Sequence, residues 1–132
     1  MPNSKHKQIS ILAVDDNPLD ILILQTLLQH HFKLKTVSSG KAALKIIEEI
    51  DFDMILMDIN LGDETLNGTD TMKLIRKNSK YQHIKIFAVT AYAEDESFYI
   101  NEGFDELYIK PVIKEDIFEF INKNLLDNDI AS

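Results

Sequence analysis

Short apolar runs alternate with longer, helix-like segments along the whole chain. The clearest run, residues 53–58, is continuously apolar between two acids, which is typical of a strand covered on both faces. The longer segments carry apolar residues three and four positions apart, the spacing of one face of a helix. This pattern predicts strands at residues 9–14, 33–37, 53–58, 84–90 and 106–110, and helices at residues 19–30, 41–49, 69–77, 94–102 and 113–125.

Residues that start and end helices lie at the boundaries of these segments. Asn17 can cap free amide groups, and Pro18 is tolerated at the first position of the helix that follows. Gly103 follows the fourth helix, where glycine often ends a helix. Five strands that alternate with five helices need crossover connections. The pattern therefore predicts an α/β fold, with a parallel sheet covered by helices on both faces.

The length of 132 residues predicts a single domain, residues 1–132, with its core at about residues 8–126 between flexible tails. Fourteen basic and 22 acidic residues give a net charge of −8, which argues against binding to nucleic acid or to an anionic membrane. The chain has no cysteine, so disulfides and thiolate metal sites are excluded. The start of the chain lacks a secretory signal, which favours a cytoplasmic protein, and the initial Met and short tails favour a whole gene product.

Polar side chains stand where the predicted strands end. Asp15 and Asp16 follow the first strand, Asp58 ends the third, Thr90 ends the fourth and Lys110 ends the fifth. In parallel sheets with helices on both faces, ligands bind beyond the carboxyl ends of the strands. We therefore expect these residues to form one site.

Three carboxylates in one small cleft would repel each other strongly unless a cation lay between them. Mg²⁺ suits this site because it prefers oxygen ligands in octahedral geometry, and the backbone carbonyl of Asn60 could add another oxygen. The ammonium of Lys110 and the hydroxyl of Thr90 would serve an anionic group. Together they favour phosphoryl transfer to a carboxylate, with Asp58 as the nucleophile on the buried strand. Each residue alone is equally compatible with a cap, a turn or a solvated surface position.

Five short motifs lie at the predicted strand ends and in the loop after the third strand: Val14-Asp15-Asp16, Met57-Asp58-Ile59-Asn60, Asn67-Gly68, Val89-Thr90-Ala91 and Ile109-Lys110-Pro111. They resemble the motifs of the response-regulator receiver domains of two-component signalling, and the resemblance extends over about residues 8–126. It implies a flavodoxin-like, doubly wound (βα)5 fold with five parallel strands in the order 2-1-3-4-5.

The resemblance also implies roles for the site residues. Asp58 would accept a phosphoryl group from a phosphohistidine, and the side chains of Asp16 and Asp58 would bind Mg²⁺ together with the carbonyl of Asn60. Asp15 would bind the ion through water or support the other ligands.

Two further residues complete the implied site. Lys110 would pair first with the acceptor carboxylate and then with a phosphate oxygen. Thr90 would move to bond the phosphoryl group. The bond before Pro111 would be cis.

The partners implied are a sensor histidine kinase or a histidine phosphotransfer protein, and an unknown downstream protein target. The first helix has more apolar residues than one inward face needs, so Leu19 with Leu22 or Ile23 could dock the phosphodonor. A broad stripe buried by the sheet and the last helix is the alternative. We expect a monomer or weak dimer that binds no nucleic acid and no membrane. It would not be an enzyme beyond its own phosphorylation and dephosphorylation.

The sequence departs from the family pattern in three places, one of which is Tyr92, two residues after Thr90 at the rim of the site. Three residues before the lysine, where the family usually has an aromatic side chain that rotates inward, this chain has Leu107, followed by Tyr108. Because neighbouring side chains of a strand point to opposite faces, Tyr108 should not replace that aromatic in the same register. Gly68 also comes ten positions after Asp58, which makes the loop between them about two residues longer than is common.

Three other functions compete with this interpretation. A phosphatase of the haloacid-dehalogenase type uses similar residues, but its nucleophile comes first, in an Asp-x-Asp motif. A flavin-binding module needs a phosphate loop after the first strand, where Asp15 and Asp16 would repel phosphate. A receiver-like interaction module that works without phosphorylation remains open because of Leu107.

Overall fold

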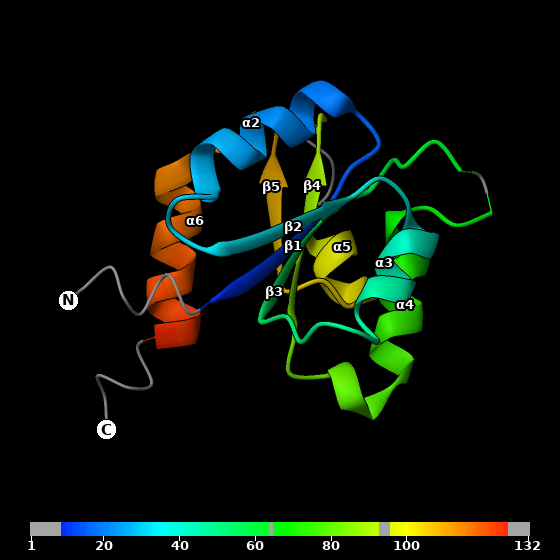
Figure 1. Cartoon of the computed structure of the whole chain (residues 1–132). Coiled ribbons are helices and arrows are strands. Elements are labelled where there is room, and N and C mark those ends of the chain that lie inside the picture. Colours follow the sequence, from blue (N-terminus) through cyan, green and yellow to red (C-terminus); the bar gives the residue numbers. More distant parts are fainter. Residues whose placement is uncertain (1–8, 64, 93–95, 127–132) are drawn as a thin grey trace.

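A parallel sheet forms the centre of the computed structural model, which describes residues 9–63, 65–92 and 96–126 (Figure 1). Its strands lie in the order β2-β1-β3-β4-β5, so the predicted order is confirmed. Every neighbouring pair is parallel. The strands are β1 (Ser10–Val14), β2 (Lys33–Val37), β3 (Met54–Asp58), β4 (Lys85–Thr90) and β5 (Glu106–Ile109), each within one residue of its predicted bounds.

Helices connect consecutive strands, and several are shorter than predicted. The α-helices are α2 (Pro18–Leu28), α3 (Gly40–Ile46), α4 (Gly68–Lys77), α5 (Glu96–Glu102) and α6 (Lys114–Ile121). A 3₁₀ turn, η1 (Ser79–Tyr81), was not predicted, and a π-helical turn, η2 (Asn122–Leu126), continues α6. The predicted helix residues 94 and 95 and the tail at residues 127–132 lie outside the described residues.

The ends of the helices show which of the predicted start and end residues are confirmed. The Asn17 side chain accepts hydrogen bonds from the backbone of Leu19 and Asp20, so its predicted capping role is confirmed. Gly103 has φ +129° directly after α5, as expected of a residue that ends a helix. The prediction that the last helix includes Ile113 was wrong. Ile113 has extended backbone before α6, and 54% of its surface is exposed.

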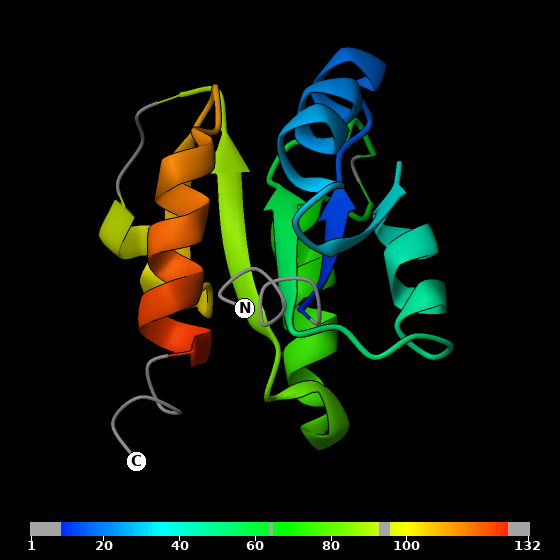
Figure 2. The ribbon, with the colours of Figure 1, turned by 60° about the vertical axis from the view of Figure 1, so that its left-hand side comes forward.

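The inner strands β1, β3 and β4 bury both of their faces, which explains their continuous apolar runs, whereas the edge strands β2 and β5 are partly exposed. On one face, alternate residues such as Leu12 and Ile55 pack with α3, α4 and α5. On the other, residues such as Ile11 and Leu56 pack with α2 and α6. Figure 2 shows α6 (orange) and α3 (cyan) on opposite sides of the strands. No helix in the described part of the chain has the length and apolar character to cross a membrane.

Arg76 of α4 forms a group of hydrogen bonds at the end of the sheet opposite the predicted site. Its guanidinium donates hydrogen bonds to the carbonyl oxygens of Ile84 (2.7 Å) and Gly103 (3.3 Å) and to the carboxylate of Asp105 (2.6 Å). That carboxylate also accepts from the backbone N–H of Ile86 at 2.8 Å. One side chain thus joins α4 to the starts of β4 and β5.

Replacing this arginine should therefore destabilise the protein more than replacing a surface lysine in the same helix. We expect Arg76→Met to lower the free energy of unfolding by about 2–4 kcal/mol, because it leaves two partly buried carbonyls without their donor and the Asp105 carboxylate without its cationic partner. Lys73→Met, which removes only an exposed pair with Glu102, should cost at most about 1 kcal/mol. Urea denaturation followed by circular dichroism measures both, and equal losses would contradict this role of Arg76.

Candidate functional site

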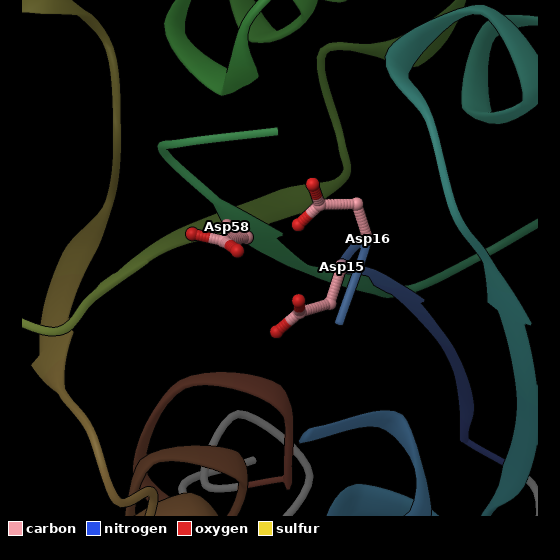
Figure 3. A group of neighbouring side chains, drawn as sticks. All are labelled: Asp15, Asp16 and Asp58. Carbon is pink, nitrogen blue, oxygen red and sulfur yellow. The ribbon is translucent and has the colours of Figure 1, made fainter. Parts of the chain in front are cut away.

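Three carboxylates meet at the carboxyl ends of β1 and β3 (Figure 3). Each of Asp15, Asp16 and Asp58 offers an oxygen atom within 4.8 Å of those of the other two. Asp15 and Asp58 are buried, with 3% and 6% of their surface exposed, whereas Asp16 faces solvent. The structure thus brings together the three acids that the sequence predicted as neighbours.

The register of the sheet produces this meeting. Val14 of β1 is paired with Met57 of β3, so the next residues, Asp15 and Asp58, stand side by side at the strand ends. Backbone N–H groups hold both carboxylates: Asn17 donates to Asp15 Oδ1 at 2.9 Å, and Asn60 donates to Asp58 Oδ1 at 3.1 Å. The hydrogen bond from its backbone N–H therefore holds Asn60, a predicted ligand, next to Asp58.

The loop after Asp58 needs glycine at two positions. A Cβ on Gly68 would lie 2.1 Å from the carbonyl oxygen of Asp58, so α4 can begin this close to β3 only with glycine. Gly62 has φ +74°, and a Cβ there would lie 2.8 Å from an Asp16 carboxylate oxygen. The longer loop therefore lies directly against one of the three acids.

Lys110 reaches the same carboxylates from the end of β5. Its Nζ lies 3.1 Å from Asp15 Oδ2 and 3.3 Å from Asp58 Oδ2. A third carboxylate, that of Asp20 in the first turn of α2, is closer at 2.7 Å. The Lys110–Pro111 peptide bond is cis, as the resemblance implied.

Thr90 ends β4, the neighbour of β3, one residue beyond Val89, the register partner of Asp58. Thr90 is buried, and its hydroxyl oxygen accepts a hydrogen bond from the Tyr92 backbone at 3.2 Å. Its carbonyl oxygen accepts from the backbone N–H of Lys110 at 2.7 Å. Thr90 on β4 thus lies between β3, which carries Asp58, and β5, which Lys110 follows.

The charges of the site act on each other's protonation. Burial and the nearby Asp15 carboxylate together raise the pKa of Asp58 to about 6, although Lys110 and the Asn60 N–H act to lower it. Burial alone would lower the pKa of Lys110. Hydrogen bonds to Asp20 and Asp15 and the charges of Asp58 and Asp15 outweigh burial, so the net pKa is raised and the ammonium stays charged.

The donor set fits a hard divalent cation. Oxygen atoms of three carboxylates converge, two of them buried beside each other, and only one nearby lysine offsets them in the described contacts. Such an oxygen-rich, negatively charged cluster suits Mg²⁺, which binds through one or two carboxylates and keeps several waters.

The position of the usual rotating aromatic holds a leucine that is already buried. Leu107 packs with the face covered by α3, α4 and α5. Tyr108 lies on the opposite face, where its ring meets Phe87 and its hydroxyl donates to the Asp116 carbonyl oxygen at 3.1 Å. The prediction that Tyr108 does not take the place of that aromatic is confirmed for this structure.

Asp20 is the site residue that the sequence analysis missed. An acid in the first turn of a helix is normally explained by its favourable interaction with the helix dipole. The available signal was its position four residues after Asp16, one helical turn above the predicted acids. The lysine that it contacts lies 90 residues away in the sequence.

Comparisons with known proteins assign the family. Residues 11–122 match the family model of the response regulator receiver domain. The chain therefore belongs to the receiver domains of two-component signalling.

Individual proteins agree with this assignment. The chain is 30% identical to the sensor histidine kinase GacS of Pseudomonas protegens over 86% of this chain and 13% of that protein. A CheY-like receiver domain protein from Methanospirillum hungatei has a similar structure, with a TM-score of 0.78, 28% identity and coverage of 94% and 98% of the two chains.

A third comparison concerns the receiver domain of a sensor histidine kinase from Pseudomonas aeruginosa, solved with a magnesium ion in its active-site cleft. It has a TM-score of 0.77 and 24% identity over 87% of this chain and 95% of that chain, which shows the shared fold. The chain spans only 13% to 24% of the length of the first curated relatives that it matches.

The raised pKa of Asp58 predicts how stability changes with pH when no divalent ion is bound. The folded state binds the proton more tightly than the unfolded state, so stability falls as pH rises from about 4 to about 6 and stays low above that range. In EDTA at pH 7.5, Asp58→Asn should be more stable than the wild type by about 3 kcal/mol, because the pKa of Asp58 is raised from 3.8 to about 6 and each pKa unit corresponds to ~1.4 kcal/mol.

Urea denaturation at pH 5 and pH 7.5 tests this prediction, and the advantage of Asp58→Asn should shrink at pH 5. The exposed acid Glu49 supplies a control, since Glu49→Gln should show no such pH-dependent difference. A variant that is less stable than the wild type at pH 7.5, or an advantage that does not change with pH, would contradict the electrostatic origin.

Proposed function

We propose that this protein is a phosphorylation-controlled receiver in which Asp58 accepts a phosphoryl group from a phosphohistidine. The observation that carries the proposal is the approach of Lys110 Nζ to Asp58 Oδ2, at 3.3 Å, beside the cluster of Asp15 and Asp16. A buried carboxylate next to a fixed ammonium and a cluster suited to a cation is what transfer of a charged phosphoryl group to an aspartate requires.

In this reaction an Asp58 carboxylate oxygen forms a bond to phosphorus while the bond from phosphorus to the donor's histidine nitrogen breaks. The nitrogen takes back the electron pair, and Asp58 becomes an acyl phosphate. The backbone N–H of Asn60, 3.1 Å from Asp58 Oδ1, holds the carboxylate in place during attack. The ammonium of Lys110 donates to a phosphoryl oxygen and offsets its charge.

Mg²⁺, when bound, would neutralise the charge that develops on the phosphoryl oxygens. We assign the carboxylates of Asp16 and Asp58 and the backbone carbonyl of Asn60 as its ligands, with Asp15 in contact through water or in support. The fit of the three clustered acids supports this assignment, as does the magnesium ion in the cleft of the Pseudomonas aeruginosa receiver, which has the same fold. Thr90 is assigned the role of bonding the phosphoryl group once it is on Asp58.

The donor is proposed to be a sensor histidine kinase or a histidine phosphotransfer protein. The start of α2, next to the site, exposes an apolar surface formed by Leu19, Leu22 and Ile23, with 63% of Leu19 accessible. A helix that carries the phosphohistidine could bury this surface while its imidazole reaches Asp58. Because the kinase consumes ATP, we place the transfer in the cytoplasm.

Phosphorylation would change the surface of the receiver, and another protein would recognise that change. The receiver itself would be a monomer or weak dimer. Its own reactions would be limited to accepting the phosphoryl group and losing it to water. Exposed apolar residues of α5, of the end of β5 and of the position before α6 could contact that target or a second copy: Phe98, Ile100, Ile109 and Ile113.

Intact-mass measurement after incubation with acetyl phosphate and Mg²⁺ tests the assignment of Asp58. We expect the wild type to gain the mass of one phosphoryl group, Asp58→Asn to gain none, and EDTA to abolish the gain. Asp53, at the other end of the same strand, provides a matched control, and Asp53→Asn should still be phosphorylated.

If Asp58→Asn also gained a phosphoryl group, the acceptor would be a residue other than Asp58. If the wild type gained no mass either, the phosphorylation-independent interaction module would replace the proposed function.

A further inference from the structure

Asp20 is the nearest partner of the lysine that the proposed reaction needs. Its Oδ2 lies 2.7 Å from Lys110 Nζ, compared with 3.1 Å for Asp15 and 3.3 Å for Asp58. An ammonium group has three N–H donors, and here three carboxylates surround it. The shortest of the three contacts of Lys110 is therefore made with Asp20 and not with Asp58, the acceptor in the proposed reaction.

The surroundings of this pair strengthen its attraction. Asp20 and Lys110 line a cavity of about 220 Å³ between α2 and the segment that follows β5, and the side chains of both are mostly buried, with 28% and 20% exposed. The rest of the wall is mainly apolar and is formed by Ile23, Leu24, Val89, Pro111 and Val112. An apolar wall lowers the local dielectric constant and so favours a close ion pair between Asp20 and Lys110. The open space of the cavity gives the ammonium group of Lys110 room to move.

Asp20 is also distinct from the cluster suited to a cation. Among the described residues, the acids whose oxygens lie within 4.8 Å of one another are Asp15, Asp16 and Asp58. A cation held by those three would offset their charges and leave Asp20 as the carboxylate that still competes for Lys110.

We propose that Asp20 is a positioning residue that restrains Lys110 and thereby limits the rate at which Asp58 is phosphorylated. This inference rests on the proposed function. To serve a phosphoryl oxygen, Lys110 must turn an N–H from Asp20 towards Asp58. This restraint on Lys110 slows the transfer.

A purely structural role for Asp20 makes a different prediction. As an acid in the first turn of α2, it also interacts favourably with the helix dipole. If that were its whole role, neutralising it would lower the thermal midpoint and leave the rate of phosphorylation unchanged.

The test compares the second-order rate constants for phosphorylation by acetyl phosphate at saturating Mg²⁺, measured by intact mass. Asp20→Asn should react at least roughly fivefold faster than the wild type, since fivefold is the effect of removing one unit charge about 4 Å away even at the dielectric constant of water. Asp63→Asn removes the same charge from the loop after Asp58, where the carboxylate accepts hydrogen bonds from Thr65 and not from Lys110. This control should change the rate by less than about twofold.

High salt separates direct restraint from a general charge effect. In 1 M salt the screening length falls to about 3 Å, so a general effect disappears while a partly buried contact persists. We expect the faster rate of Asp20→Asn to remain in 1 M salt, and Asp20→Ala to behave in the same way.

A rate equal to or below that of the wild type, or a gain that matches Asp63→Asn or disappears in 1 M salt, would overturn the inference and leave the proposed function intact. If the wild type were not phosphorylated, or Asp58→Asn were, the proposed function would fail and this inference with it.

Discussion

One ammonium group at the carboxyl end of the sheet has to offset several carboxylates. Lys110 Nζ lies within 3.3 Å of oxygens of Asp15, Asp20 and Asp58, and Asp16 stands beside them. Asp15 and Asp58 are buried, so their repulsion is only weakly screened by water. The fold therefore holds an excess of negative charge that destabilises it, and a divalent cation or a proton on Asp58 relieves that strain.

The remaining structure keeps these charges in place. The register of β1 and β3 sets Asp15 beside Asp58, and both faces of the sheet are packed with apolar side chains. Gly68 lets α4 begin against the Asp58 backbone, where any side chain would collide. At the opposite end, Arg76 joins α4 to the starts of β4 and β5. Because the scaffold is rigid at both ends, the acids cannot relax their repulsion by moving apart.

The sequence was sufficient to predict the sheet and the three clustered acids, because both follow from local patterns. Continuous apolar runs identify buried strands, and the residue after each parallel strand necessarily lies at the same edge. Ile113 was placed wrongly because helical spacing does not show where a helix begins, and its extended backbone lies outside α6. The contact of Asp20 with Lys110 could not be predicted, since it depends on how α2 lies against the end of β5 across 90 residues of sequence. The roles of the site residues remain predictions.

The central claim is that Asp15, Asp16 and Asp58 form the site of one divalent cation. A crystal grown with Mn²⁺, which takes the same oxygen ligands as Mg²⁺ and gives an anomalous signal, measures this directly. We expect a single anomalous peak about 2 Å from carboxylate oxygens of Asp16 and Asp58. A fully occupied Mn²⁺ site elsewhere, with no peak between these acids, would contradict the claim.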